Sequence, residues 1–168
     1  MGTSYVTFGR KADADGVSRG GDLAGFWMTD GLLELWLRLL ALHVEDALPG
    51  EPERGAIARA IRDDWLLASR GWFGGCVPHG LQEAVATEEG MDIVRRAICS
   101  LQAALAASPD ELTPETLNLM GIERAFAMPI ATWRLRDTAV AFLDLLEGRI
   151  TSTNHDCALM PGSIPLPR

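Results

Sequence analysis

Four stretches of the chain repeat apolar side chains with the 3.6-residue period of an α-helix, and this pattern most constrains the fold. Alternation of period two, which strands show, is nearly absent. The sequence therefore predicts an all-α fold, an irregular helical bundle of about four long helices plus short helical turns, with one candidate turn at Leu81–Ala86 and others in residues 108–131. We expect the long helices at residues 30–48, 52–70, 87–105 and 132–147.

The first of these helices is predicted to lie in the middle of the bundle, because its polar side is narrow. Glu34, Arg38 and Glu45 project within about 40° of one another on a helical wheel. The remaining surface is apolar, with Trp36 at its centre. His43 falls on the same apolar stripe as Trp36, so we expect both side chains in the core, with His43 hydrogen bonded to a loop carbonyl or to a carboxylate.

The two ends of the chain have compositions that disfavour regular structure. Residues 1–29 are rich in glycine, and only Tyr5–Phe8 alternates, so we expect an extended arm that lacks an evident strand partner. Prolines 161, 165 and 167 predict an irregular tail. Residues 1–168 are thus expected to form a single domain, with an arm at 1–29, a helical core at 30–150 and a Pro-rich C-terminal tail at 151–168.

Charge and composition exclude several classes of function. The net charge of −8 is spread evenly along the chain, and no cluster of basic residues exists to hold phosphates, which disfavours nucleic acids and favours a basic protein partner. The N-terminus lacks the pattern of a signal peptide, and no apolar run has membrane-spanning length. Three widely spaced cysteines fit reduced thiols. We expect a cytoplasmic protein, bacterial because all but one of its basic residues are Arg, as in GC-rich genomes.

The loop between the second and third helices is the strongest candidate for function. It combines several glycines with Trp72, Phe73, Cys76 and His79. Aromatic side chains dominate binding hot spots, so these four residues are the predicted partner-binding set. In the alternative, both rings fold back over the core and the glycines merely permit the bend.

An enzymatic reading of the same loop needs a nucleophile, a base and an orienting group. Cys76 with His79 or His43, and Asp64 as the carboxylate, supplies these residue types. No family-specific flank accompanies them. Asp64 lies at the edge of an apolar helix face, where we expect it to accept hydrogen bonds from a neighbouring loop.

Metal and cofactor sites find little support in the sequence. Cys76 and His79 could pair with His155 and Cys157 as a zinc site, but one residue between His155 and Cys157 is tighter than structural zinc sites use. Cys99 is close to two arginines, which could make its thiol reactive, although we favour a small residue at a helix crossing. The glycines lack the spacing of a phosphate-binding loop. We predict no metal and no cofactor.

The sequence thus favours a non-enzymatic protein-interaction module and leaves an enzymatic role open. In size, acidity and the lack of a catalytic signature, the chain resembles the bacterial immunity proteins, inhibitors that bind and block a toxin. This resemblance is one of class, carried by no motif. The alternative is a small helical enzyme or ligand-binding protein that uses the loop of Cys76 and His79.

Overall fold

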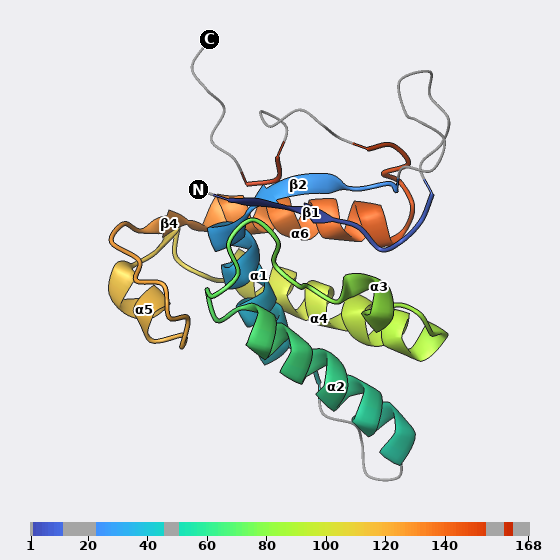
Figure 1. Cartoon of the computed structure of the whole chain (residues 1–168). Helices are drawn as coiled ribbons and strands as arrows, with labels where there is room; N and C mark the ends of the chain where they lie inside the picture. The colour runs from blue at the N-terminus through green and yellow to red at the C-terminus, as the bar shows by residue number, and fades with distance from the viewer. Residues whose placement is uncertain (1, 12–22, 46–50, 154–159, 163–168) are drawn as a thin grey trace.

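The computed structural model describes residues 2–11, 23–45, 51–153 and 160–162, and Figure 1 shows its course. Helices make up most of it, but two small antiparallel sheets accompany them, so the all-α prediction was wrong. In chain order the elements are β1 (Thr3–Val6), β2 (Phe26–Thr29), α1 (Asp30–Leu42), α2 (Pro52–Ala68), α3 (Leu81–Ala84), α4 (Glu88–Ala106), β3 (Glu111–Leu112), α5 (Pro114–Asn118), β4 (Ile130–Ala131) and α6 (Thr132–Leu146).

The strand partner that the N-terminal arm lacked in the sequence is β2. The strands β1 and β2 pair antiparallel, with Tyr5 opposite Trp27. Their inward residues alternate with half-buried ones, and Val6 and Met28 are fully buried. The described part of the arm thus contains a paired strand, β1, and β2 continues without a break into α1.

The four long helices lie near their predicted positions, although α1 ends at Leu42 rather than near residue 48. Thr87 caps α4 as predicted, its hydroxyl accepting a hydrogen bond from the Gly90 amide at 3.0 Å. Among the described residues only four helices have seven residues or more, so the predicted count fits loosely. The helix α1 packs on α2, and α4 packs on α6.

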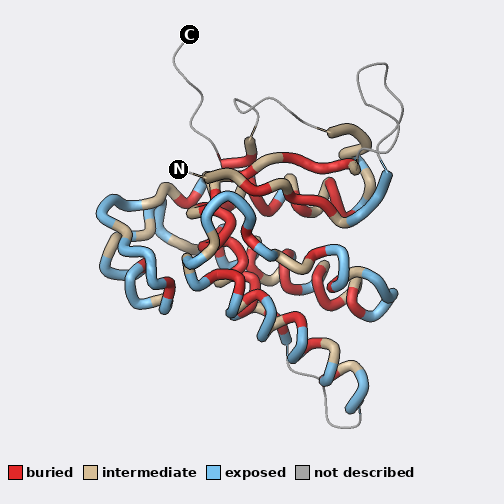
Figure 2. The backbone as a smooth tube through the Cα atoms, in the orientation of Figure 1, coloured by how far each residue is buried: buried red, intermediate tan, exposed pale blue. Residues whose placement is uncertain are grey.

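Aromatic side chains join these layers in one core. The buried Phe142 ring of α6 lies 5.7 Å from Phe26 of β2 and 5.3 Å from Trp36 of α1, measured between ring centroids. In Figure 1 the β1–β2 sheet lies along α6, and Figure 2 shows α1 buried along most of its length. The predicted burial of Trp36 is confirmed.

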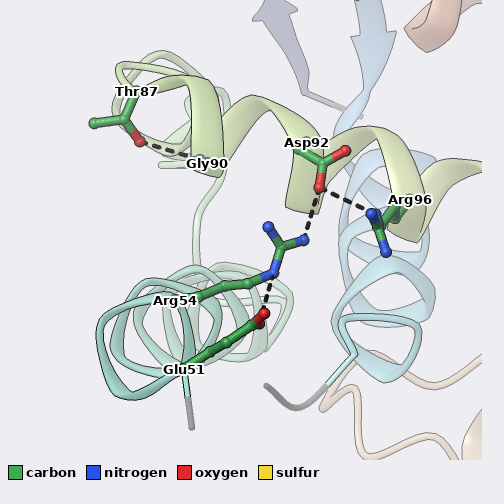
Figure 3. Close-up of polar contacts among 6 residues, drawn as sticks. All are labelled: Glu51, Arg54, Thr87, Gly90, Asp92 and Arg96. Atoms are coloured by element: carbon green, nitrogen blue, oxygen red, sulfur yellow. Dashed lines mark hydrogen bonds and ion pairs between the residues drawn. The ribbon is translucent and has the colours of Figure 1, made fainter. Parts of the chain in front are cut away.

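A polar network holds the N-terminal half of α2 against α4 (Figure 3). Arg54 of α2 donates to the Asp92 carboxylate at 2.7 Å, and Arg96 lies 3.0 Å from the same carboxylate. Glu51 lies 3.8 Å from Arg54. These side chains are partly exposed, so they fix the register of the two helices more than they stabilise the fold.

Residues 107–131, which we call the lobe, carry β3, α5 and β4 and project from the body beside the N-terminal end of α1 (Figure 1). The sequence indicated short helical pieces here, but not the pairing of β3 with β4. Leu117 and Ile122 anchor the lobe through buried side chains. Most of its backbone is exposed, as Figure 2 shows.

The described part of the tail lies against α6. Gly162 donates from its amide to Asp137 at 2.7 Å, and its carbonyl accepts from the Arg134 guanidinium. His155 and Cys157, whose close spacing disfavours a zinc site, lie outside the described residues. Within the described ranges, no helix has both the length and the apolar character needed to cross a bilayer.

Candidate functional site

The loop that follows α2 is anchored by His79, one of the candidate catalytic residues. Its Nδ1 accepts a hydrogen bond from the Leu81 amide at 3.2 Å, so its Nε2 carries the proton and donates to the Tyr5 carbonyl at 2.9 Å. Burial lowers the pKa of His79, and the hydrogen bond to Tyr5 opposes this. The His79 carbonyl also accepts from the Trp65 indole at 3.1 Å. His79 is therefore a neutral imidazole whose hydrogen bonds connect the loop to β1 and α2.

A second anchor of the loop is a buried carboxylate that sequence reasoning read only as a helix start. Asp30 accepts from the Ser4 hydroxyl and from the Gly75 amide, both at 2.7 Å. The Ser4 oxygen in turn accepts from the Val77 amide at 2.8 Å. Every polar group in this series of hydrogen bonds has a partner, so the series holds the loop against β1 and α1. No local signal in the sequence indicates this role, because Ser4 and Gly75 are far from Asp30 in the chain.

The residues of the enzymatic alternative lie on different elements. Cys76 is exposed on the loop, and Asp64 is exposed on α2 instead of binding a loop. His43 is half-buried, and its Nδ1 pairs at 3.0 Å with the Ser100 hydroxyl of α4, rather than with a loop carbonyl or Asp64. Burial lowers the His43 pKa. No hydrogen bond joins Cys76, His79, His43 and Asp64 to one another among the described residues.

Metal ligands do not gather in the described part of the chain. Its ranges contain no group of three or more His, Cys, Asp or Glu side chains arranged to hold an ion. Cys99, like Cys76, is an exposed thiol outside any disulfide.

The two aromatic residues of the loop have opposite environments. Phe73 is half-buried against the core, whereas the Trp72 side chain is 55% exposed. The Arg70 guanidinium lies 4.7 Å from the centre of the Trp72 ring, a cation–π distance, and the indole nitrogen donates to Glu123 of the lobe. Glu123 itself donates its amide to the Arg70 carbonyl at 3.0 Å. Trp72 is thus an exposed ring held from two sides.

Beneath Trp72, the lobe covers the polar stripe of α1. The Glu34 side chain is fully buried, and its Oε2 accepts from the Arg124 guanidinium at 3.0 Å. Its other oxygen has no partner among the described residues. Burial raises the Glu34 pKa and the bond to Arg124 opposes this. The narrow polar side of α1 is covered in part by the lobe, because Arg124 binds Glu34 and the Gly121 carbonyl accepts from Arg38 at 2.9 Å.

Among the described residues, three large exposed apolar side chains belong to the lobe or contact it. Of the seven large apolar residues that are exposed in the described ranges, Leu119 and Met128 are in the lobe and Trp72 touches it. Leu119 is 87% and Met128 is 72% exposed. We call these three residues the Trp72 surface. The lobe around them is acidic, with one arginine against four carboxylates, those of Asp110, Glu111, Glu115 and Glu123.

A hollow of about 590 Å³ lies elsewhere, between β2, α6 and residues 149–153. Its carboxylates already bind groups of this chain. Asp137 accepts from the Gly162 amide, and Asp144 lies 2.6 Å from Arg149. We assign this hollow no binding role.

Comparison with known proteins identified no relative of this chain. No family model, curated protein or solved structure matched the chain.

Proposed function

We propose that this protein is a non-enzymatic interaction module and that its Trp72 surface binds a basic protein partner. The observation that carries the proposal is the exposed Trp72 ring, held between Arg70 and Glu123. A large ring that is already fixed loses little conformational entropy on binding, and Trp is the residue type most enriched among energetic hot spots. Leu119 and Met128 add apolar area beside it on the lobe.

The charge of the surroundings supports a basic partner. The lobe carries four carboxylates and one guanidinium, and the whole chain has a net charge of −8. An acidic rim around apolar anchors attracts a basic protein and rejects an acidic one. Blocking the partner, as immunity proteins do, would require no chemistry beyond this contact.

The enzymatic alternative has less support from the contacts. His79 uses both ring nitrogens in bonds to the backbone, so it holds no free nitrogen to take a proton from Cys76. Asp64 and His43 are bonded to neither of them.

Affinity capture from extracts of the source cells tests the proposal. We expect the wild-type protein to retain a basic protein that Trp72→Ala and Leu119→Ser variants lose, because each substitution removes an apolar anchor. Leu67→Ser is the matched control, since Leu67 is 52% exposed on α2, outside the Trp72 surface. Circular dichroism would verify that all variants are folded. Capture of the same proteins by the wild type and by Trp72→Ala would contradict the proposal.

A further inference from the structure

A second hollow, of about 260 Å³, lies between α2 and α3, and nothing in the proposed interaction uses it. Its apolar wall comes from Ile57, Ile61 and Trp65 of α2 and from Ala84 of α3. Trp65 is fully buried and is fixed by the hydrogen bond from its indole to the His79 carbonyl. The wall is therefore preformed.

The hollow stays open because Gly80 lies at its edge. Gly80 has φ +59°, a left-handed conformation that L side chains rarely adopt, and an added Cβ would meet no atom within 4 Å. The chain turns there directly into the four-residue helix α3. The turn thus leaves a hollow at the surface next to the buried Ile61 and Trp65.

Two carboxylates line the hollow from facing elements, Asp64 from α2 and Glu83 from α3. Both residues are exposed, and no hydrogen bond or ion pair within the described ranges involves either side-chain carboxylate. Of the three arginines of α2, none lines the hollow, and Arg54 is engaged with Asp92 and Glu51 (Figure 3). The hollow therefore combines an apolar wall with negative charge that the chain does not compensate.

We propose that this hollow binds a small organic ammonium ion with an aliphatic or aromatic body. The body would pack on Ile57 and Ala60, next to the buried Ile61 and Trp65, and the ammonium group would lie between the carboxylates of Asp64 and Glu83. Pockets for drug-sized ligands span roughly 300–1,000 Å³, so a hollow of about 260 Å³ suits a smaller molecule. A neutral apolar molecule would leave the carboxylates uncompensated, and an anion would be repelled.

The probe for the test is 2-phenylethylammonium, titrated into the full chain while the indole N–H resonance of Trp65 is followed by NMR. A Trp65→Phe variant assigns that resonance. We expect a saturable shift, with affinity at least about threefold higher than for the neutral 2-phenylethanol, because exposed charge pairs contribute modest energies. The anionic 3-phenylpropionate should not bind.

Matched variants separate charge from shape. Asp64→Asn and Glu83→Gln should each weaken binding of the ammonium by about two- to fivefold. Asp63→Asn should leave it unchanged, because Asp63 is an exposed carboxylate of the same helix that does not line the hollow. Ala60→Leu should fill the hollow and abolish binding of both probes, and a thermal melt would show that this variant is folded.

Several results would overturn the inference. These are the absence of a saturable shift at Trp65, equal affinities for the ammonium and the alcohol, or an Asp63→Asn effect as large as that of Asp64→Asn. Binding of a lysine-containing peptide without binding of the free ammonium would also overturn it, since the occupant would then be a protein side chain. None of these outcomes involves Trp72, so they are independent of the proposed function.

Discussion

At the scale of single residues, the neighbouring rings of Trp72 and Phe73 are expected to contribute differently to stability. Trp72→Ala removes an exposed ring, so we expect it to lower the free energy of unfolding by about 1 kcal/mol or less. Phe73 packs against the core, and Phe73→Ala should cost about 2–3 kcal/mol, less than for a fully buried ring. Urea unfolding measures both values. If Trp72→Ala lowered the free energy of unfolding more than Phe73→Ala, Trp72 would be a residue that stabilises the fold and not one that anchors a partner.

Glu34 predicts a pH dependence of stability with a definite sign. Its pKa in the folded protein is raised by burial above the ordinary value of 4.5. The folded state therefore holds this proton more tightly than the unfolded state, and stability falls as pH rises from the unfolded pKa through the folded one. Glu34→Gln cannot ionise. In urea unfolding from about pH 4 to about pH 7, we expect its stability relative to the wild type to increase with pH. A constant difference would contradict the raised pKa.

Arg124, which lowers the Glu34 pKa and so opposes the effect of burial, provides a second test. Arg124 lowers the Glu34 pKa through its hydrogen bond and its charge. Arg124→Ala should therefore raise that pKa further, and the decline in stability should extend to higher pH than in the wild type. Combining Arg124→Ala with Glu34→Gln should abolish this added pH dependence. If Arg124→Ala alone left the pH profile unchanged, the ion pair would not act on Glu34.

At the scale of the elements, the contact between β1 and the start of β2 depends on Gly25. A Cβ at Gly25 would lie 2.1 Å from the Val6 carbonyl oxygen, a backbone atom that cannot move alone. We expect Gly25→Ala to cost at least about 2 kcal/mol through displacement of β1. Gly74→Ala is the control, since its Cβ would meet no atom within 4 Å, and its stability should change by about 0.5 kcal/mol or less. Thermal unfolding compares the two, and equal melting temperatures would contradict this packing.

The sequence placed the long helices well because their signals are local. The apolar period and the cap at Thr87 are readable within a few turns. The β1–β2 pair was missed because its strands have four residues each and nineteen residues separate Val6 from Phe26. The second strand also runs directly into α1, so the alternation of its buried and half-buried residues could not be told apart from the apolar pattern of the helix.

The site was predicted in part, for a similar reason. The loop and its aromatic residues could be singled out from composition, but a helical wheel cannot show that the lobe, about ninety residues later, covers Glu34. One partner of each of His79 and Asp30 lies in β1, whose pairing was not predicted. Asp64 at the edge of an apolar face was the signal of the α2–α3 hollow, which became visible only once α3 was placed beside it.

At the scale of the whole molecule, the chain uses several arginines internally. Arg38, Arg54 and Arg124 bind acceptors of this chain, and Arg70 lies on Trp72. Arg124 is compensated by the buried Glu34, whereas Arg38 and Arg70 keep their positive charge next to the four carboxylates of the lobe. Long-range attraction and short-range anchoring are then supplied by different residues, so they should be separable in the kinetics of binding.

Salt should act on the rate of association with the captured basic partner, and Trp72→Ala should act on dissociation. Between about 50 and about 500 mM salt, we expect the association rate constant to fall about tenfold or more, because the attraction between net charges is screened, while dissociation changes less. Trp72→Ala should increase the dissociation rate constant and leave the salt dependence of association unchanged, because it alters no charge. Surface plasmon resonance measures both constants. An association rate constant that does not respond to salt would show that charge does not select the partner. The proposal of a basic partner would then be wrong, and the partner would be recognised through apolar contact alone.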